Sequence, residues 1–264
     1  MTTLASLDHA GGRYGRRQAM RAELSKLRTL RSTTWTLLAT VIGSLAISVL
    51  ASNNTGAHGK VVPGFDPTNQ SLSGLTLGSL TIGILGILAI TGEYSSGTIR
   101  STLAATPRRP LFIAAKAAVV GLMALVVGEM LTFACFFLGQ GIMAGHAPTA
   151  SLGQSGVLTA LVLSGAFLSL LGLIGLALGV IIRHTAGAIG AFVGIIFLLT
   201  ALLQPLRQHG NPGRYAPEEI FSNSVAAVVH QPGQLGTWAG FLLMVGYCVV
   251  AFAVAFACVI RRDA

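Results

Sequence analysis

The residue of this sequence most suited to chemistry is Glu129, a carboxylate in the middle of a long apolar run. A carboxyl group is costly to place in the hydrocarbon of a membrane, and such groups commonly mark functional positions. Glu129 could line a transport path, hold a cation or a proton, or accept a hydrogen bond from a serine or threonine of another helix. The first two roles are functional and the third is structural, and the sequence leaves all three open.

Other reactive side chains are sparse and scattered. Cys135, Cys248 and Cys258 lie in apolar segments without metal-ligand spacing, so we interpret them as small core residues and predict no metal site. His146 and His230 fall in or near polar loops, where surface positions are expected. Without a cluster of nucleophile, base and metal ligands, the sequence does not predict an enzyme.

A loop for nucleotide phosphates is also missing from the sequence. The pattern G-x-x-x-x-G-K-[ST] does not occur, and its nearest approach, Gly59-Lys60, is followed by Val61. We therefore expect no cofactor on this chain, and any ATP and Mg²⁺ must be bound by a separate protein.

The elements that position these residues follow from composition. Of 264 residues, 53% are hydrophobic and only 9% charged, whereas soluble domains carry about 25% charged residues. The chain is therefore predicted to be an integral membrane protein embedded in the lipid bilayer. Its net charge of +9 comes from basic residues that flank apolar runs and are not interleaved with aromatics, which argues against nucleic acid as a partner.

Six apolar runs are long enough to cross a bilayer, which takes about 20 residues, and backbone buried in lipid favours helices. The sequence thus predicts an all-α, six-span domain over residues 35–264 after a leader, residues 1–34. The third run exceeds one crossing, so one of its ends is expected to project into water. The predicted spans are 35–51, 72–91, 111–143, 157–182, 186–204 and 238–260.

The basic residues predict the orientation of these spans. Of the 17 Lys and Arg residues, only Lys60, Arg207 and Arg214 fall on one side of a six-span arrangement. Because basic loops stay in the cytosol, we expect both termini, residues 91–116 and the short turn at Arg183 to be cytoplasmic. High Ala, Gly and Arg content suggests a bacterial plasma membrane.

Two polar segments are predicted to carry short amphipathic helices. In residues 18–34, Met20, Leu24, Leu27 and Leu30 recur at helical spacing. This pattern fits an interfacial helix and a plain orientation signal equally well. In residues 91–116, glycines and Pro107 delimit a short helix, for which an ordinary solvated loop is the alternative. The apolar stripe of that second helix would consist of Ile99, Leu103 and Ala104.

A longer pattern decides between these alternatives. Residues 92–109 read G-E-Y-x-x-G-T-I-R-x-x-L-x-x-x-P-x-R, with Lys116 following, and the chain enters its first span with ELSKLRTLRSTTWTLL and ends in IRRDA. These motifs resemble the type-2 ABC transporter permeases, whose fold also occurs in the lipid and multidrug half-transporters of the G subfamily. The resemblance covers essentially the whole chain.

The resemblance implies the membrane subunit of an ATP-driven exporter, with a separate ABC ATP-binding subunit as partner. The segment between spans two and three would be a cytoplasmic coupling helix docked on that ATPase, and residues 18–34 would be a connecting helix. Residues 205–237 would hold an extracellular helix starting near Pro217. The coupling role would fall to Glu93, Gly97, Thr98, Arg100, Leu103, Pro107 and Arg109.

Six spans are half of the usual twelve in such exporters, so a second copy or a close relative is expected to pair with this chain. Glycines four residues apart let helices approach closely, either within one chain, the favoured interpretation, or between copies. These pairs are Gly74 and Gly78, Gly175 and Gly179, and Gly190 and Gly194.

A different functional class stays open. An ion-coupled secondary transporter would use Glu129 as its proton or cation site, but such transporters usually carry several ionisable residues and internal repeats. Only one deep carboxylate is found here. Dependence on a separate ATPase would distinguish the two classes.

Overall fold

The computed structural model describes residues 31–58, 64–98, 109–203, 205, 211–227 and 233–262. Within these ranges every regular element is helical, and six helices are long and apolar enough to cross a membrane, which confirms the all-α, six-span prediction. Their bounds are α2 (Arg31–His58), α4 (Leu75–Ser95), α6 (Arg109–Met143), α7 (Val157–Ile182), α8 with its continuation α9 (Thr185–Val193, Leu199–Leu203), and α11 (Thr237–Arg262).

The long third run is one unbroken helix. α6 has 35 residues, about 50 Å at 1.5 Å per residue, against a hydrocarbon core of about 30 Å. The predicted leader helix falls mostly outside the described residues. So does the predicted coupling helix between Gly97 and Pro107, of which only Thr98 is described, in helical conformation.

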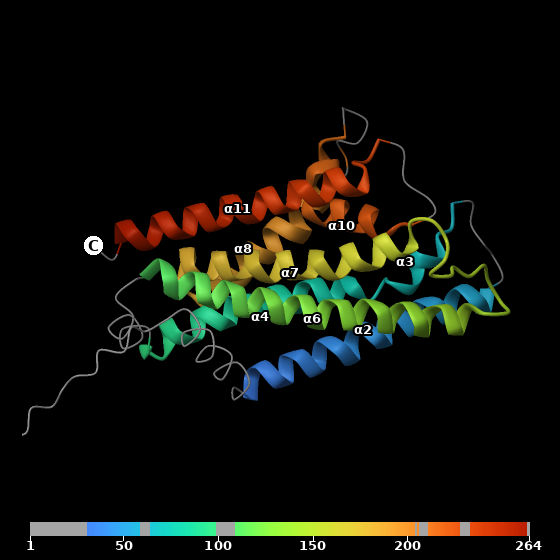
Figure 1. Ribbon diagram of the computed structural model, residues 1–264, viewed down its shortest axis with the longest axis horizontal. Coiled ribbons are helices and arrows are strands. Elements are labelled where there is room, and N and C mark those ends of the chain that lie inside the picture. The colour runs from blue at the N-terminus through green and yellow to red at the C-terminus, as the bar shows by residue number, and fades with distance from the viewer. Residues whose placement is uncertain are drawn as a thin grey trace, which may run out of the picture.

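The spans lie side by side along the long axis of the molecule, and Figure 1 shows the short elements gathered at one end. These are α3 (Pro67–Ser71), η3 (Pro212–Tyr215) and α10 (Pro217–Val225). We call this the α10 end. At the opposite end, here named the Lys116 end, lie the end of α4, the start of α6 and the turn between α7 and α8. The predicted helix after Tyr215 is confirmed, because α10 begins at Pro217 with Glu218 and Glu219 in its first turn.

α7 forms the centre of the bundle and packs against α4, α6, α8 and α11. It meets α4 with little side chain in between: a methyl group at Gly86 would overlap the carbonyl oxygen of Gly172, and one at Gly175 would overlap that of Gly83. Backbones can approach so closely only where small residues face each other. α2, α11 and the α8–α9 span are far less buried than α7 and form the periphery.

The glycine pairs of the sequence separate into two kinds. Gly74 and Gly78 pack against Ser44 of α2, and Gly175 and Gly179 pack against α4, all within this chain. A methyl group at Gly190 or Gly194 would meet no atom within 4 Å in the described part of the chain. That third notch therefore lies open on the fifth span.

The fifth span is not a regular α-helix. Between α8 and α9 the residues Gly194–Leu198 form a π-helical turn, η1. The buried residues of the whole fifth span recur every four positions, at Ala188, Phe192, Ile196 and Thr200. Phe192 faces α4, where a methyl group at Gly83 would overlap its ring.

Candidate coupling site

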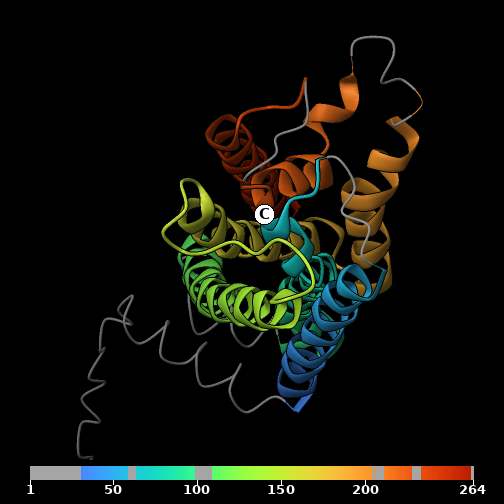
Figure 2. The same ribbon diagram turned by 90° about the vertical axis from the view of Figure 1, so that its right-hand side faces the viewer.

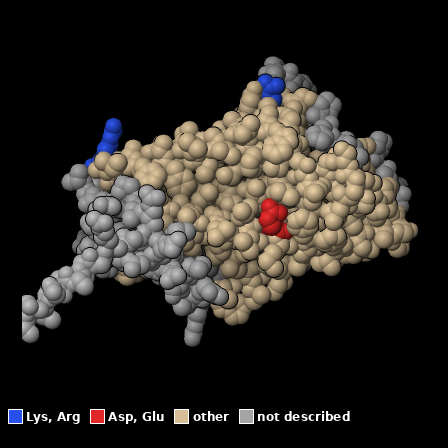
Figure 3. Space-filling model, in the orientation of Figure 1, with Lys and Arg blue, Asp and Glu red and all other residues tan. Residues whose placement is uncertain are grey.

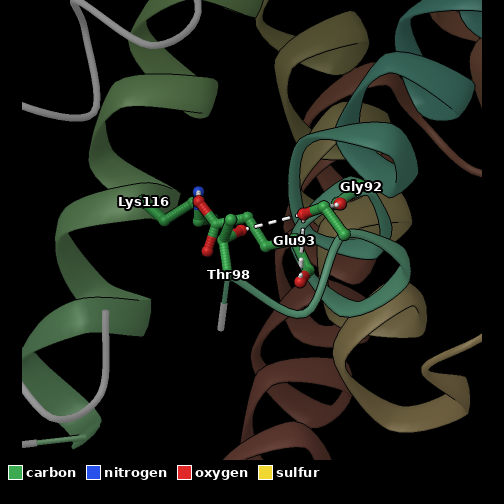
Figure 4. Close-up of polar contacts among 5 residues, drawn as sticks. Gly92, Glu93, Thr98 and Lys116 are labelled. Atoms are coloured by element: carbon green, nitrogen blue, oxygen red, sulfur yellow. Dashed lines mark hydrogen bonds and ion pairs between the residues drawn. The ribbon is translucent and has the colours of Figure 1, made fainter. Parts of the chain in front are cut away.

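Three of the predicted coupling residues lie in the last turn of α4 or directly after the helix ends at Ser95. Glu93 lies in that turn, and Gly97 follows it with a φ of +70°, a left-handed conformation that glycine adopts without strain. The Ser96 hydroxyl donates to the Gly92 carbonyl oxygen over 2.8 Å and lies 2.9 Å from the Thr98 hydroxyl. Figure 4 shows this turn folding back beside Glu93. The motif thus closes α4 and fixes where the chain leaves it.

Glu93 is bound to another helix. Its carboxylate accepts a hydrogen bond from the Lys116 ammonium of α6 over 3.0 Å, and only 3% of the lysine and 12% of the glutamate side chain are exposed. Figure 4 shows Lys116 reaching across to Glu93. The same ammonium lies 5.2 Å from the centre of the Phe112 ring. A buried pair of this kind holds its geometry, because either charge alone would be costly to bury.

The neighbouring residue of the motif contacts a third element. The Arg183 guanidinium lies 5.5 Å from the centre of the Tyr94 ring, a cation–π contact. Arg183 ends α7 in a left-handed conformation, φ 59°, and its N–H donates to the Gly179 carbonyl oxygen. His184 then caps α8 by accepting from the Gly187 N–H. The tight turn predicted between spans four and five is confirmed.

Together these contacts join α4, α6 and the α7–α8 turn into one group of charged and aromatic side chains. We call Glu93, Tyr94, Lys116 and Arg183 the Glu93 cluster. The chain leaves α4 beside it and returns at the start of α6.

The remaining predicted coupling residues lie wholly or partly outside the part of the chain that the structure describes. Arg109 is the first residue of α6, but its side chain is not described, and Arg100, Leu103 and Pro107 lie outside the described residues. Sequence reasoning missed the ion-pair role of Lys116 and the contact of Arg183 with Tyr94. The only signal for the first was a lysine closely following the motif.

Glu129 is placed apart from this cluster, about midway along α6. Its carboxyl group lies over Gly165 of α7, so closely that a methyl group at Gly165 would overlap it. The Oε2 atom is buried without a hydrogen-bond partner among the described residues. Figure 3 shows an isolated acidic patch on this face, surrounded by uncharged atoms. α6 and α7 also meet closely here, because Gly128 faces the Gly165 carbonyl oxygen.

Among the described residues, no three His, Cys, Asp or Glu side chains lie close enough together to hold a metal ion. The three cysteines are free thiols, with Cys135 and Cys248 buried.

One comparison with known proteins is positive. A family model described as "ABC-2 family transporter protein" matches residues 19–203, a stretch that includes the whole Glu93 cluster and the first five spans. No curated protein matches the chain significantly.

Proposed function

Because the chain belongs to the ABC-2 transporter family, and so is a membrane permease of an ABC transporter, we propose that it forms the translocation pathway of an ATP-driven exporter. In this proposal ATP and Mg²⁺ are bound by a separate ABC ATPase. The chain itself performs no chemistry on the nucleotide. The Lys116 end and both termini face the cytosol of a bacterial cell.

The observation that supports this proposal most strongly is the buried Glu93–Lys116 pair. It joins the two helices between which the predicted coupling helix lies, and Tyr94 extends the contact to Arg183. An ATPase docked at this end would therefore move α4, α6 and the α7–α8 turn together. A loop without such contacts would absorb the displacement.

The mechanism follows as a shift between two populations. ATP binding closes the paired ATPases and favours the permease conformation that is open to the outside, and hydrolysis releases it. In this proposal the ATPase contacts the coupling segment, and the Glu93 cluster transmits the displacement to the spans. The residues that carry coupling, without any catalytic role, are Glu93, Gly97, Thr98, Arg100, Leu103, Pro107 and Arg109.

A second copy, or a close relative, completes the pathway in this proposal. At Gly190 and Gly194 of the fifth span an added methyl group would meet no described atom within 4 Å, so this open notch would let a partner helix approach closely. Gly190→Leu should then weaken association of the chain, as measured by cross-linking in membranes. Gly246→Leu, at another open glycine position on α11, is the matched control.

Co-purification tests the proposed ATPase partner. The tagged chain, extracted in mild detergent, should retain an ABC ATPase identified by mass spectrometry. Arg109→Glu should lose this partner, whereas Arg214→Glu at the α10 end should keep it. A preparation without an ATPase, or equal retention by both variants, would contradict the proposal.

Glu129 is the basis for one alternative function, an ion-coupled secondary transporter. Its Oε2 atom is buried without a hydrogen-bond partner among the described residues, which leaves an oxygen that could take up a proton. An ion-coupled transporter would move its substrate in ATP-free vesicles driven by an ion gradient, and Glu129→Gln would abolish that movement. The exporter would be inactive under the same conditions.

A further inference from the structure

Glu129 lies on a face of α6 that is left open in the described part of the chain. α6 packs against α7, α2, α3 and α4. Figure 2, which looks along the spans from the α10 end, shows α6 at the outside of the bundle, with α7 between it and α11. Exposure of the neighbouring side chains agrees with this position, because Val126 is 50% and Met130 70% exposed. The surroundings of Glu129 are therefore open to the lipid.

Glu129 also lies deep in the membrane. It is about 20 Å along the helix axis from both Lys116 and Met143, at 1.5 Å per residue. With a hydrocarbon core of about 30 Å, a residue in the middle of this 35-residue helix is surrounded by acyl chains. Lipid head groups and hydrated metal ions stay outside that layer. A ligand that meets Glu129 must therefore be soluble in hydrocarbon.

The carboxyl group of Glu129 has no counter-charge in the described part of the chain. No basic side chain described there pairs with it, and Figure 3 shows the Lys and Arg side chains of this face well apart from the acidic patch. The side chain is half-buried, and because Oε2 is buried, a ligand would meet the outer oxygen, Oε1. A negative charge in hydrocarbon is costly, and a cation brought to it from the lipid would offset that cost.

Aromatic side chains continue the same face of α6 towards the α10 end. Phe133 lies one helical turn beyond Glu129 and Phe137 one turn beyond Phe133, and residues four apart share a helix face. The two rings stack with their centres 6.4 Å apart, and Phe137 is 56% exposed. Aromatic faces attract organic cations and pack well against other rings. A carboxyl group and an aromatic surface are thus adjacent on this face.

The shape of this face favours a small ligand over a further helix. Helices approach each other closely in lipid where small residues meet. Gly128 and Gly165 are already used in the contact between α6 and α7. The outer face carries the large exposed side chains of Met130 and Phe137, which would hold another backbone away from the carboxyl group.

We propose that the face of α6 and α7 around Glu129 binds a lipophilic organic cation, a quaternary ammonium or phosphonium ion that carries apolar rings. Its positive charge lies against Oε1 of Glu129, and its rings lie on Phe133 and Phe137. The ligand reaches this face sideways from the bilayer. The proposal concerns binding alone, so it is tested without the ATPase and does not depend on ATP-driven export.

Tetraphenylphosphonium tests this proposal on the purified full chain in lipid nanodiscs. Binding of the radiolabelled ion, after subtraction of its uptake by empty nanodiscs, should saturate. Tetraphenylborate has the same shape and the opposite charge, and it should show no saturable binding. Equal saturable binding of both ions would mean that the face recognises rings alone and would overturn the proposal. Absence of saturable phosphonium binding, as when a second copy covers this face, would also overturn it.

Three variants locate the binding. Glu129→Gln should weaken phosphonium binding by at least about tenfold, because it removes the charge that faces the ligand. Phe133→Leu should weaken it about threefold through loss of the ring. Glu218→Gln, which removes a carboxyl group at the α10 end, is the matched control and should bind as the unchanged protein does. Unaltered binding by Glu129→Gln would refute the assignment.

Protection from chemical labelling tests the same contact without any substitution. Dicyclohexylcarbodiimide, a hydrophobic reagent for carboxyl groups embedded in membranes, should modify Glu129, as measured by mass spectrometry of the digested protein. Tetraphenylphosphonium should slow this modification, and tetraphenylborate should not. Labelling of Glu129 at the same rate with and without the phosphonium ion would place the ligand elsewhere and contradict the proposal.

Discussion

Lys116 of α6 donates a hydrogen bond over 3.0 Å to Glu93 of α4, across a gap in sequence of 23 residues. Both side chains are largely buried, so the pair joins two spans directly and independently of the segment that connects them along the chain. Neither partner can be removed without leaving the other charge in a poorly solvated place.

Removing the lysine should therefore destabilise the protein more than removing both charges. Lys116→Met is expected to lower the free energy of unfolding by about 3 kcal/mol, because it removes the ammonium group that faces a largely buried carboxylate. The double variant Glu93→Gln/Lys116→Met should recover most of that loss. Unfolding in mixed detergent micelles measures both, and losses that simply add would show that the two charges do not interact.

The contact between Glu129 and Gly165 predicts a rescue. Gly165→Ala should cost only about 0.5–1.5 kcal/mol, because the Glu129 carboxyl that the added methyl group overlaps is the end of a flexible side chain and can turn aside. Glu129→Ala in the same chain should restore the melting temperature by vacating that space. Gly141→Ala, at an open position of α6, is the control and should have little effect. Failure of the rescue would mean that the α6–α7 backbone itself cannot accept the methyl group.

Gln140 holds α3 and the 144–156 loop onto α6. Gln140→Leu should cost about 2–4 kcal/mol, because it leaves the Pro67 carbonyl and the Ala150 N–H without this partner. The exposed Gln154→Leu provides the matched control. Hydrogen exchange should show faster exchange at Ala150 and in α3, and unchanged exchange there would contradict the role given to Gln140.

The α10 end should respond to pH through Glu218. Burial, aided by the nearby charge of Glu219, raises the pKa of the Glu218 carboxyl from 4.5 to about 7. The folded protein then keeps a proton that the unfolded chain has released, so stability falls as pH rises from about 4.5 to about 7 and is level above.

Melting temperatures between pH 4 and 8 measure this effect as a difference between two chains. Glu218→Gln should melt several degrees above the unchanged protein at pH 8 and coincide with it near pH 4, because each pKa unit corresponds to about 1.4 kcal/mol. Histidines occur in both chains, so their titration shifts both melting temperatures equally and does not affect the difference between them. An equal difference at every pH would exclude Glu218 as the titrating group.

The apolar runs were enough to predict the number and type of the spans. Their continuity leaves helices as the only option in lipid, so even the 35-residue α6 and the turn at Arg183 followed from local sequence. The start of α10 followed from Pro217 and the acidic residues after it, which suit the first turn of a helix.

The contacts between spans could not be predicted from the sequence. All three glycine pairs carry the same spacing, yet two pack inside the chain and Gly190 and Gly194 do not, because the outcome depends on which helix is adjacent. Lys116 was recognised only as part of a motif, since an ion pair between helices depends on their relative rotation. A polar cavity at the α10 end is lined both by Asp66 before α3 and by Asn223 of α10, and no local pattern indicates that residues so far apart in the sequence lie together.

The π-helical turn in the fifth span has a consequence for insertions and deletions. In an ideal α-helix, four residues overshoot one turn by about 40°, so buried residues at 188, 192, 196 and 200 would wind about a third of the way around the axis. The wider turn at Gly194–Leu198 cancels this drift and keeps them facing the bundle. Deleting one residue there would leave a regular helix with the same buried face. Homologous sequences should therefore be able to lack one residue at this point, whereas a one-residue deletion elsewhere in the span would turn the buried face away from the bundle.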